Sequence, residues 1–206
     1  MTKTRRPTVL LPATLLSCAL FLLAGCVTDN RHVMLISAAD QKMVLLRDGQ
    51  PIRSYPVSTS KFGLGDRPGS NHTPLGKLRV KKKIGHELPE GTVFKSRVPT
   101  GEVLPVDAPG RDPIVTRILW LDGLEPGNRN AFGRYIYIHG TPEERNIGLP
   151  VSYGCIRMRS RDVVELFDVV GPHARVYITP NPLPAALAGT PPAADVSQNY
   201  GDPPRF

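Results

Sequence analysis

The sequence is poor in cysteine and in aromatic residues: its 206 residues include three Cys, one Trp, six Tyr and six Phe. Cysteine and histidine residues do not occur at the spacing of zinc ligands, so we expect no metal site. Basic and aromatic residues do not alternate and no nucleic-acid motif is present, so we expect no nucleic-acid partner. The formal net charge of +8 instead suits an acidic polymer or anionic lipid headgroups.

Residues 1–25 have the pattern of a secretory signal peptide. Basic residues without an acid precede the apolar run Val9–Leu23, which is short for a membrane span. The run ends in Leu23-Ala24-Gly25-Cys26, the pattern of a bacterial lipobox, so we expect cleavage before Cys26 and lipidation of its thiol. Ordinary secretory cleavage with an unmodified Cys26 and an uncleaved membrane anchor are the alternatives.

This signal predicts an exported lipoprotein that is attached to a membrane through Cys26 and faces the periplasm. Val27 follows Cys26, where an Asp commonly retains lipoproteins in the inner membrane. Its absence favours the outer membrane over the inner one.

The segments that follow divide the mature chain into three parts. Residues 26–31 form a short lipidated tether, residues 32–180 form one domain that is long enough for a hydrophobic core, and residues 181–206 form a tail. The tail is rich in Pro and Ala and poor in large apolar residues. It cannot bury enough surface to offset its ordering entropy, so we expect it to be disordered.

Within the domain, short β-rich runs and turn residues predict a mainly β fold. The turn Asp48-Gly49 joins two of the expected strands. The segment 85–116 is rich in Gly, Pro and charge and yields no assignment. The expected strands are His32–Ala38, Lys42–Arg47, Ile52–Val57, Lys77–Ile84, Arg117–Leu121, Arg134–His139 and Ala174–Thr179.

One helix is expected after residue 159. Ser160 can cap it, Asp162 lies in its first turn, and Gly171-Pro172 ends it. An apolar face follows at Val163, Val164, Leu166, Phe167 and Val170. A small β-sandwich or open barrel with one or two short helices fits these elements best.

A candidate catalytic pair lies in the stretch HGTPEERNIGLPVSYGCIRM, His139–Met158. Once Cys18 is cleaved off and Cys26 is lipidated, Cys155 is the remaining free thiol, in a compartment where thiols usually pair. The common alternative is an inert buried cysteine. A thiol is largely protonated at neutral pH, and an imidazole such as that of His139 can take its proton and return one to a leaving amine.

The residues around Cys155 predict a tight turn that serves this chemistry. Gly154 lets the backbone bend at the nucleophile, and the amides of Tyr153, Gly154 and Cys155 can point at one oxyanion. Acidic residues are absent as an obvious third member of the pair. The carbonyl of Gly140 can orient the imidazole of His139 in their place.

These motifs resemble the L,D-transpeptidases of the YkuD type, which remodel bacterial peptidoglycan. The resemblance rests on HGT at 139–141, SYGCIRM at 152–158 and the upstream stretch VSTSKFGLGDRPGSNHTPLG at 57–76, in the family's order. It implies the family's catalytic fold, Cys155 as nucleophile and His139 as base, with no metal or organic cofactor. It also implies Arg157 and Ser152 as substrate-binding residues, with a structural salt bridge as the alternative for Arg157.

The implied reaction uses peptidoglycan tetrapeptide stems. Cys155 attacks the carbonyl of the third stem residue, a thioester forms, and an amine on a neighbouring stem completes a 3→3 cross-link in cell-wall biogenesis. Water as acceptor, which gives a carboxypeptidase or amidase, and attachment of a protein lysine are alternatives. A catalytically silent wall-binding lipoprotein is a further alternative from another class.

The sequence departs from the family pattern at one position. The family usually has His two positions before the Cys, where this chain has Tyr153. The backbone amide of Tyr153 remains, so the oxyanion argument is unaffected.

Overall fold

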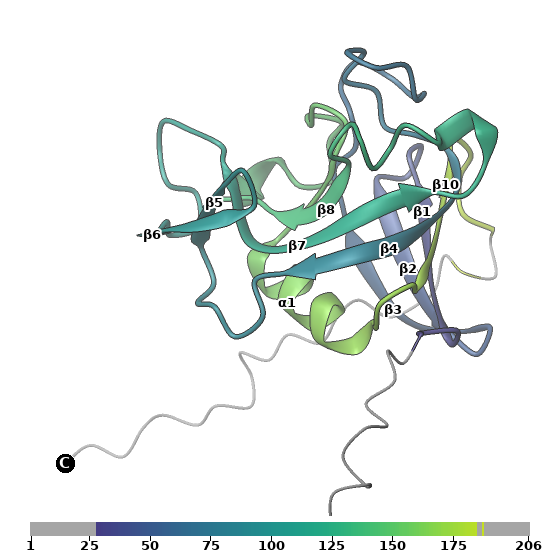
Figure 1. The fold of residues 1–206 in the computed structure, drawn as a ribbon, viewed down its shortest axis with the longest axis horizontal. Helices are drawn as coiled ribbons and strands as arrows, with labels where there is room; N and C mark the ends of the chain where they lie inside the picture. Colours follow the sequence, from purple (N-terminus) through teal and green to yellow (C-terminus); the bar gives the residue numbers. More distant parts are fainter. Residues whose placement is uncertain (1–27, 185–186, 188–206) are drawn as a thin grey trace, which may run out of the picture.

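Ten β-strands form one continuous sheet in the computed structural model, which describes residues 28–184 and 187 (Figure 1). The expected mainly β fold is confirmed, with one α-helix and short 3-10 turns beside the sheet. The elements are β1 (His32–Ser37), β2 (Lys42–Arg47), β3 (Gln50–Pro56), β4 (Gly76–Ile84), β5 (Thr92–Lys95), β6 (Val98–Val103), β7 (Ile114–Gly123), η2 (Pro126–Asn128), β8 (Tyr137–Gly140), η3 (Glu144–Asn146), β9 (Ile156–Met158), α1 (Ser160–Val169) and β10 (Arg175–Thr179).

The sheet has a main path and a branch. The main path runs β3-β2-β1-β10-β4-β7-β5-β6, and β8 pairs with β7 and carries β9 on its other edge. Buried apolar residues alternate along β10 and the first half of β4, as period-two patterning requires when one face meets a core, whereas β7, β8 and β9 are buried along most of their length. The largest core cluster takes side chains from both parts of the sheet and from α1, so the sheet curls around it with the helix alongside (Figure 1).

The structure corrects two expectations at element ends and assigns one segment that had no prediction. The strand expected at Arg134–His139 begins only at Tyr137, because Tyr135 has a positive φ of 58° that no regular strand accepts. Ser160 is the first residue of α1 and does not cap it; its hydroxyl instead contacts the Thr116 hydroxyl at 2.7 Å. The unassigned segment 85–116 contains the hairpin β5–β6 and the start of β7.

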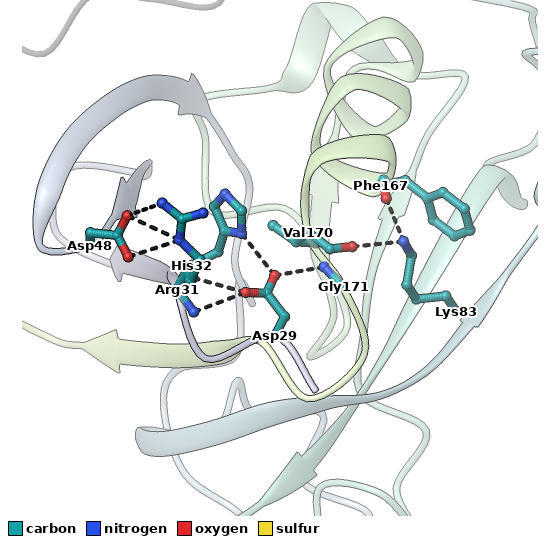
Figure 2. A network of polar contacts seen from close by, with 8 residues as sticks. All are labelled: Asp29, Arg31, His32, Asp48, Lys83, Phe167, Val170 and Gly171. Atoms are coloured by element: carbon teal, nitrogen blue, oxygen red, sulfur yellow. Dashed lines mark hydrogen bonds and ion pairs between the residues drawn. The ribbon is translucent and has the colours of Figure 1, made fainter. Parts of the chain in front are cut away.

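Residues ahead of β1 are fixed to the end of α1 (Figure 2). The Asp29 carboxylate accepts hydrogen bonds from the amides of Gly171 at 2.7 Å and His32 at 3.0 Å, and the Asp29 amide donates to the Pro172 carbonyl at 2.8 Å. Burial alone raises the pKa of the Asp29 carboxyl, but these hydrogen bonds bring it below its usual value. The described part of the predicted tether, 28–31, therefore belongs to the folded domain.

The C-terminal end of α1 is closed by a lysine from β4. Lys83 Nζ donates to the carbonyls of Phe167 at 2.6 Å and Val170 at 2.7 Å (Figure 2). These are carbonyls that the last turn leaves without helical partners, and the ammonium also opposes the negative end of the helix dipole. Burial lowers the pKa of Lys83, and its two carbonyl partners satisfy the charged form.

The fold continues slightly beyond the predicted domain end. Leu183 is buried, its amide donates to the Asp40 carboxylate, and the Asn181 carbonyl accepts from the Ser37 hydroxyl. Residues 181–183 are therefore tied to the folded domain; most of the expected tail lies outside the described residues, as do the expected signal peptide 1–25 and Cys26. Across 28–184 and 187, no helix has the length and apolar character needed to cross a membrane.

Asn128 fixes the connection between β7 and β8 to the segment that leads into β4. Its side-chain amide donates to the carbonyls of Leu75 at 2.8 Å and Lys77 at 2.9 Å, and its oxygen accepts from the Glu125 amide at 2.9 Å. The residue is fully buried, so none of these backbone groups can turn to water instead.

We expect Asn128→Ala to lower the free energy of unfolding by about 3 kcal/mol, because it leaves buried carbonyl and amide groups unpaired. Urea unfolding followed by circular dichroism measures the change. Gln50→Ala, at an exposed position of β3, is the control and should change it by less than about 0.5 kcal/mol. Equal stability of the two variants would contradict this account of the connection.

Candidate active site

The parallel pairing of β8 and β9 brings the two sequence motifs together. The register sets Ile138 beside Ile156 and His139 beside Arg157. Ile138 and Ile156 point into the core, so the alternation of a strand turns His139 and Arg157 to the opposite face. Cys155 immediately precedes β9 and lies on that same opposite face, across from Tyr137. His139 and Cys155 are thus on one side of a two-strand pair.

The Cys155 thiol is half-buried against backbone groups of the neighbouring chain. Its Sγ accepts from the Tyr137 amide at 3.4 Å and donates to the Tyr135 carbonyl at 3.4 Å. Burial raises the pKa of the thiol to about 11, against the opposing effects of the Tyr137 amide and the charges of Arg157 and Arg134. The Cys155 thiol is therefore protonated at neutral pH.

The His139 imidazole is buried and is held in one tautomer. Its Nδ1 lies 2.8 Å from the Gly140 carbonyl, which can only accept, so Nδ1 carries the proton and Nε2 keeps a lone pair. Gly140 thus stands where an orienting acceptor was expected. The pKa of His139 is lowered to about 4. Burial is the main cause, the hydrogen bond to the Gly140 carbonyl opposes it, and the charge of Arg157 adds to the lowering. The ring is a neutral base near pH 7.

No hydrogen bond joins the His139 ring to Cys155 within the part of the chain that the structure describes. Contacts of this kind often tighten only when a substrate completes the site. The two groups share a face of the β8–β9 pair, and both are uncharged at neutral pH.

Residues 152–155, here named the cysteine turn, are shaped by Gly154. This glycine has a φ of 116°, and a Cβ there would lie 3.2 Å and 3.3 Å from the carbonyls of His72 and Asn71. Both the conformation and the close approach require glycine. Inside the turn, the Ser152 hydroxyl donates to the Cys155 carbonyl at 2.6 Å and accepts from the Gly154 amide at 3.2 Å.

These bonds change two expected roles. Ser152, expected to bind substrate, is fully buried and holds the turn instead. The Gly154 amide, expected to face an oxyanion, is bonded to Ser152. For the amides of Tyr153 and Cys155, no acceptor is found among the described residues, so these two remain available to an oxyanion.

Arg157 forms the salt bridge that was the alternative to substrate binding. The guanidinium is almost completely buried and lies 2.5 Å from Asp112, with Glu143 at 4.0 Å. Thr141, from the His-Gly-Thr motif, donates to the other oxygen of Asp112 at 2.5 Å. Asp112 was not predicted as a site residue, because it lies in the unassigned segment 85–116. The pair fixes β9 to the residues that follow β8.

The upstream motif at 57–76 wraps around the cysteine turn. Ser58 pairs with Arg157 and Ser60 with Ser152 through isolated β-bridges. The Thr73 hydroxyl accepts from the Ser60 amide and donates to the Gly154 carbonyl, each at 3.0 Å. The upstream motif and the cysteine turn, which are far apart in the sequence, therefore lie side by side at Cys155.

A buried arginine missed by the sequence analysis holds the loop within this motif. Arg134 forms an ion pair with Asp66 at 2.9 Å and donates to the His72 carbonyl at 2.6 Å. His72 thereby has its backbone fixed beside Gly154, while its ring lies near Gly65. The charge of Arg134 also favours a thiolate at Cys155.

Aromatic side chains form a second flank of the thiol. Cys155 packs against a cluster that includes Trp120 and Tyr137. The Trp120 ring stacks on Phe132 at 4.1 Å, and the Arg97 guanidinium lies 4.9 Å from the Trp120 ring centre and 3.2 Å from the Tyr137 hydroxyl. Phe132 therefore supports the cluster. Arg97, at the tip of the β5–β6 hairpin, was not predicted.

Among residues 28–184 and 187, no group of three or more His, Cys, Asp and Glu side chains is placed to hold an ion. His32 contacts Asp29 at 2.8 Å and His86 is exposed beside Glu87, both far along the chain from Cys155. The site supports acyl transfer by a thiol and an imidazole.

The lowered pKa of His139 makes stability fall in mild acid. The unfolded imidazole binds a proton near pH 6.5 whereas the folded one does so only near pH 4, so acid favours the unfolded chain between these values. Between pH 6.5 and 4.5 this effect is about 2 to 3 kcal/mol.

We expect His139→Gln to remove this part of the pH dependence and leave the rest. Urea unfolding at pH 6.5 and 4.5 should show a smaller loss of stability in the variant than in the original chain. Parallel losses in the two proteins would mean that His139 is not held neutral by the fold.

Two curated relatives share substantial identity with the chain. It is 42% identical over 168 residues to the probable L,D-transpeptidase YcfS of Escherichia coli, which covers 74% of this chain and 45% of that protein. It is 37% identical over 91 residues to the putative L,D-transpeptidase YkuD of Bacillus licheniformis, covering 40% of this chain and 51% of that protein. The chain thus spans about half the length of these relatives.

Solved structures give a weaker likeness. L,D-transpeptidase 3 from Mycobacterium tuberculosis, in complex with a faropenem-derived adduct, has a TM-score of 0.47 and 20% identity, covering 72% of this chain and 60% of that one. The family of L,D-transpeptidase catalytic domains named YkuD matches residues 31–178, which contain β8, β9 and the cysteine turn. The chain therefore belongs to the YkuD family of L,D-transpeptidase catalytic domains.

Proposed function

We propose that this chain is a cysteine-dependent L,D-transpeptidase that acts on peptidoglycan stem peptides and forms 3→3 cross-links through a thioester at Cys155. The observation that carries the proposal is the parallel register of β8 and β9, which turns a half-buried thiol and a neutral imidazole to one face. The family membership and the names of the relatives support it.

The first half-reaction starts from neutral groups. The pKa of the thiol, about 11, lies far above that of the imidazole, about 4, so no stable thiolate–imidazolium pair exists at rest. The proton of Sγ passes to Nε2 of His139 as sulfur bonds to the carbonyl carbon of the third stem residue. The negative charge then develops on the carbonyl oxygen, within reach of the amides of Tyr153 and Cys155.

Collapse of this intermediate breaks the bond to the terminal D-amino acid. The departing amine takes the proton from the His139 imidazolium, which leaves a thioester on Cys155 and a neutral ring. In the second half-reaction a side-chain amine of a neighbouring stem attacks the thioester and loses a proton to His139. The new amide forms, and the proton returns to the departing sulfur.

Burial of Arg157 and Arg134 serves both half-reactions. Each guanidinium is held by a carboxylate, Asp112 or Asp66, so neither can swing toward the solvent. Both charges favour the anionic sulfur, and that of Arg157 also disfavours a protonated His139. The fold thus keeps the base free while it assists the nucleophile.

We expect the full chain in detergent to convert purified disaccharide-tetrapeptide into a dimer that has lost one D-Ala. Mass spectrometry identifies the product, and Cys155→Ala should form none. His139→Gln should lower the rate by at least about a hundredfold, because it removes the base that takes the proton of the thiol. Cys155→Ala protein that still makes the dimer would contradict the proposal.

Other products would assign another acceptor. Tripeptide monomer alone indicates water and a carboxypeptidase, and a stem joined to a lysine of an added wall protein indicates protein attachment. Complete absence of turnover, with Cys155 also unreactive toward iodoacetamide, would favour a silent wall-binding protein.

We also propose that the chain is an exported lipoprotein, lipidated at Cys26 and facing the periplasm, with the outer membrane as its site. The lipobox ending at Cys26 and the Val at position 27 support this. We expect the full chain to appear in the outer-membrane fraction of cells and Cys26→Ser to leave the membrane fractions. Recovery of the original chain with the inner membrane would contradict the outer-membrane assignment.

A further inference from the structure

Lys61, Phe62 and Tyr153 form an exposed group beside the cysteine turn that the proposed chemistry does not use. Tyr153 lies two positions before the nucleophile, where the family usually has a histidine. The Phe62 residue is 46% exposed and Tyr153 is 56% exposed, unusual values for large rings that touch each other. The Phe62 and Tyr153 ring centres are 5.4 Å apart.

The backbone places these side chains together. The Ser152 amide donates to the Thr59 carbonyl at 3.0 Å, and the Lys61 amide donates to the Ser152 carbonyl at 3.1 Å. This short parallel pairing sets Ser60 beside Ser152, both buried. The next residue on each strand, Lys61 and Tyr153, therefore turns outward on the same side. The position of the lysine relative to the tyrosine is fixed before any ligand binds.

The side-chain contacts leave binding capacity unused. Lys61 Nζ donates to the Tyr153 hydroxyl at 3.1 Å and lies 4.4 Å from the Tyr153 ring centre and 5.2 Å from that of Phe62. An ammonium has three donors, and a phenol that accepts one hydrogen bond can still donate its own proton. None of the ion pairs among the described residues includes Lys61, so no carboxylate within 28–184 neutralises it.

We propose that Lys61 and Tyr153 form a carboxylate-binding subsite for the stem peptide, with Phe62 as its apolar wall. The proposal rests on the proposed function, because the ligand is the peptide that Cys155 attacks. A carboxylate there receives one hydrogen bond from the ammonium and one from the phenol, a charge-assisted pair that neutral acceptors cannot match. Rings on either side of the ammonium reduce its hydration and strengthen the attraction.

Stem peptides offer carboxylates from two sources. One is the terminal carboxylate of the departing D-amino acid, one residue beyond the attacked carbonyl. The others are internal carboxylates of the stem. Both sources share the chemistry that Lys61 and Tyr153 recognise, and peptides amidated at one source or the other separate them.

The test measures kcat and KM with the full chain and its variants. We expect Lys61→Met, which keeps the length of the side chain, to raise KM for the tetrapeptide about tenfold while kcat changes by less than about twofold. Tyr153→Phe removes only the hydroxyl and should raise KM about fivefold. Lys77→Met, at an exposed position of β4, changes the net charge equally and should leave KM unchanged.

Amidated peptides show which carboxylate is bound. If the terminal carboxylate is the ligand, a peptide amidated at its terminus should have the same KM with the original chain and with Lys61→Met. If an internal carboxylate is the ligand, the peptide amidated at that internal position should have the same KM with both proteins. A tenfold effect of Lys61→Met that persists with both amidated peptides would overturn the subsite. So would a lowered melting temperature with equal losses for every peptide, the result of a purely structural role.

A binding experiment separates this proposal from the proposed function. Calorimetry with Cys155→Ala protein measures tetrapeptide affinity without turnover, and adding Lys61→Met should weaken it about tenfold. Turnover by the original chain with no effect of Lys61→Met would retain the transpeptidase and reject the subsite. Charge-dependent binding without turnover would retain the subsite and reject the transpeptidase.

Discussion

Everything at the site depends on three residue pairs of parallel β-structure between β8 and β9. A shift of one residue would exchange the two faces and send the imidazole of His139 into the core while Ile138 met the solvent. The register is secured from outside the pair: Arg157 is tied to Asp112, and Ser58 and Ser60 pair with Arg157 and Ser152. Long-range pairing of this kind costs loop entropy, which the shared core repays.

Electrostatics at the site favour neutrality. A thiolate and an imidazolium in this partly closed place would each lose hydration, so burial moves both pKa values toward the uncharged forms. Both groups are therefore uncharged at neutral pH. A thiol that stays protonated is also a poor target for oxidation.

Local patterns predicted the long strands and the helix, because β-rich runs and the apolar face of a helix are properties of residues that are close in sequence. The strand β6 was missed because it is exposed along nearly its whole length and shows no alternation. Tyr135 looked like a strand residue, yet its positive φ follows from the contacts of its surroundings. The sequence motifs identified His139 and Cys155 as candidate site residues. Asp112 and Arg97 join the site only through tertiary contacts, which no local sequence pattern reveals.

The hydrogen bond between the Gly171 amide and the Asp29 carboxylate would limit how freely the domain moves if Cys26 carries the proposed lipid anchor. Only three peptide units separate Cys26 from Asp29, a span of at most about 10 Å. A chain lipidated at Cys26 would then have almost no flexible linker between its lipid and the folded domain. Its working height above the bilayer would be set by the body of the domain, and it would reach only the wall layer that lies within that radius.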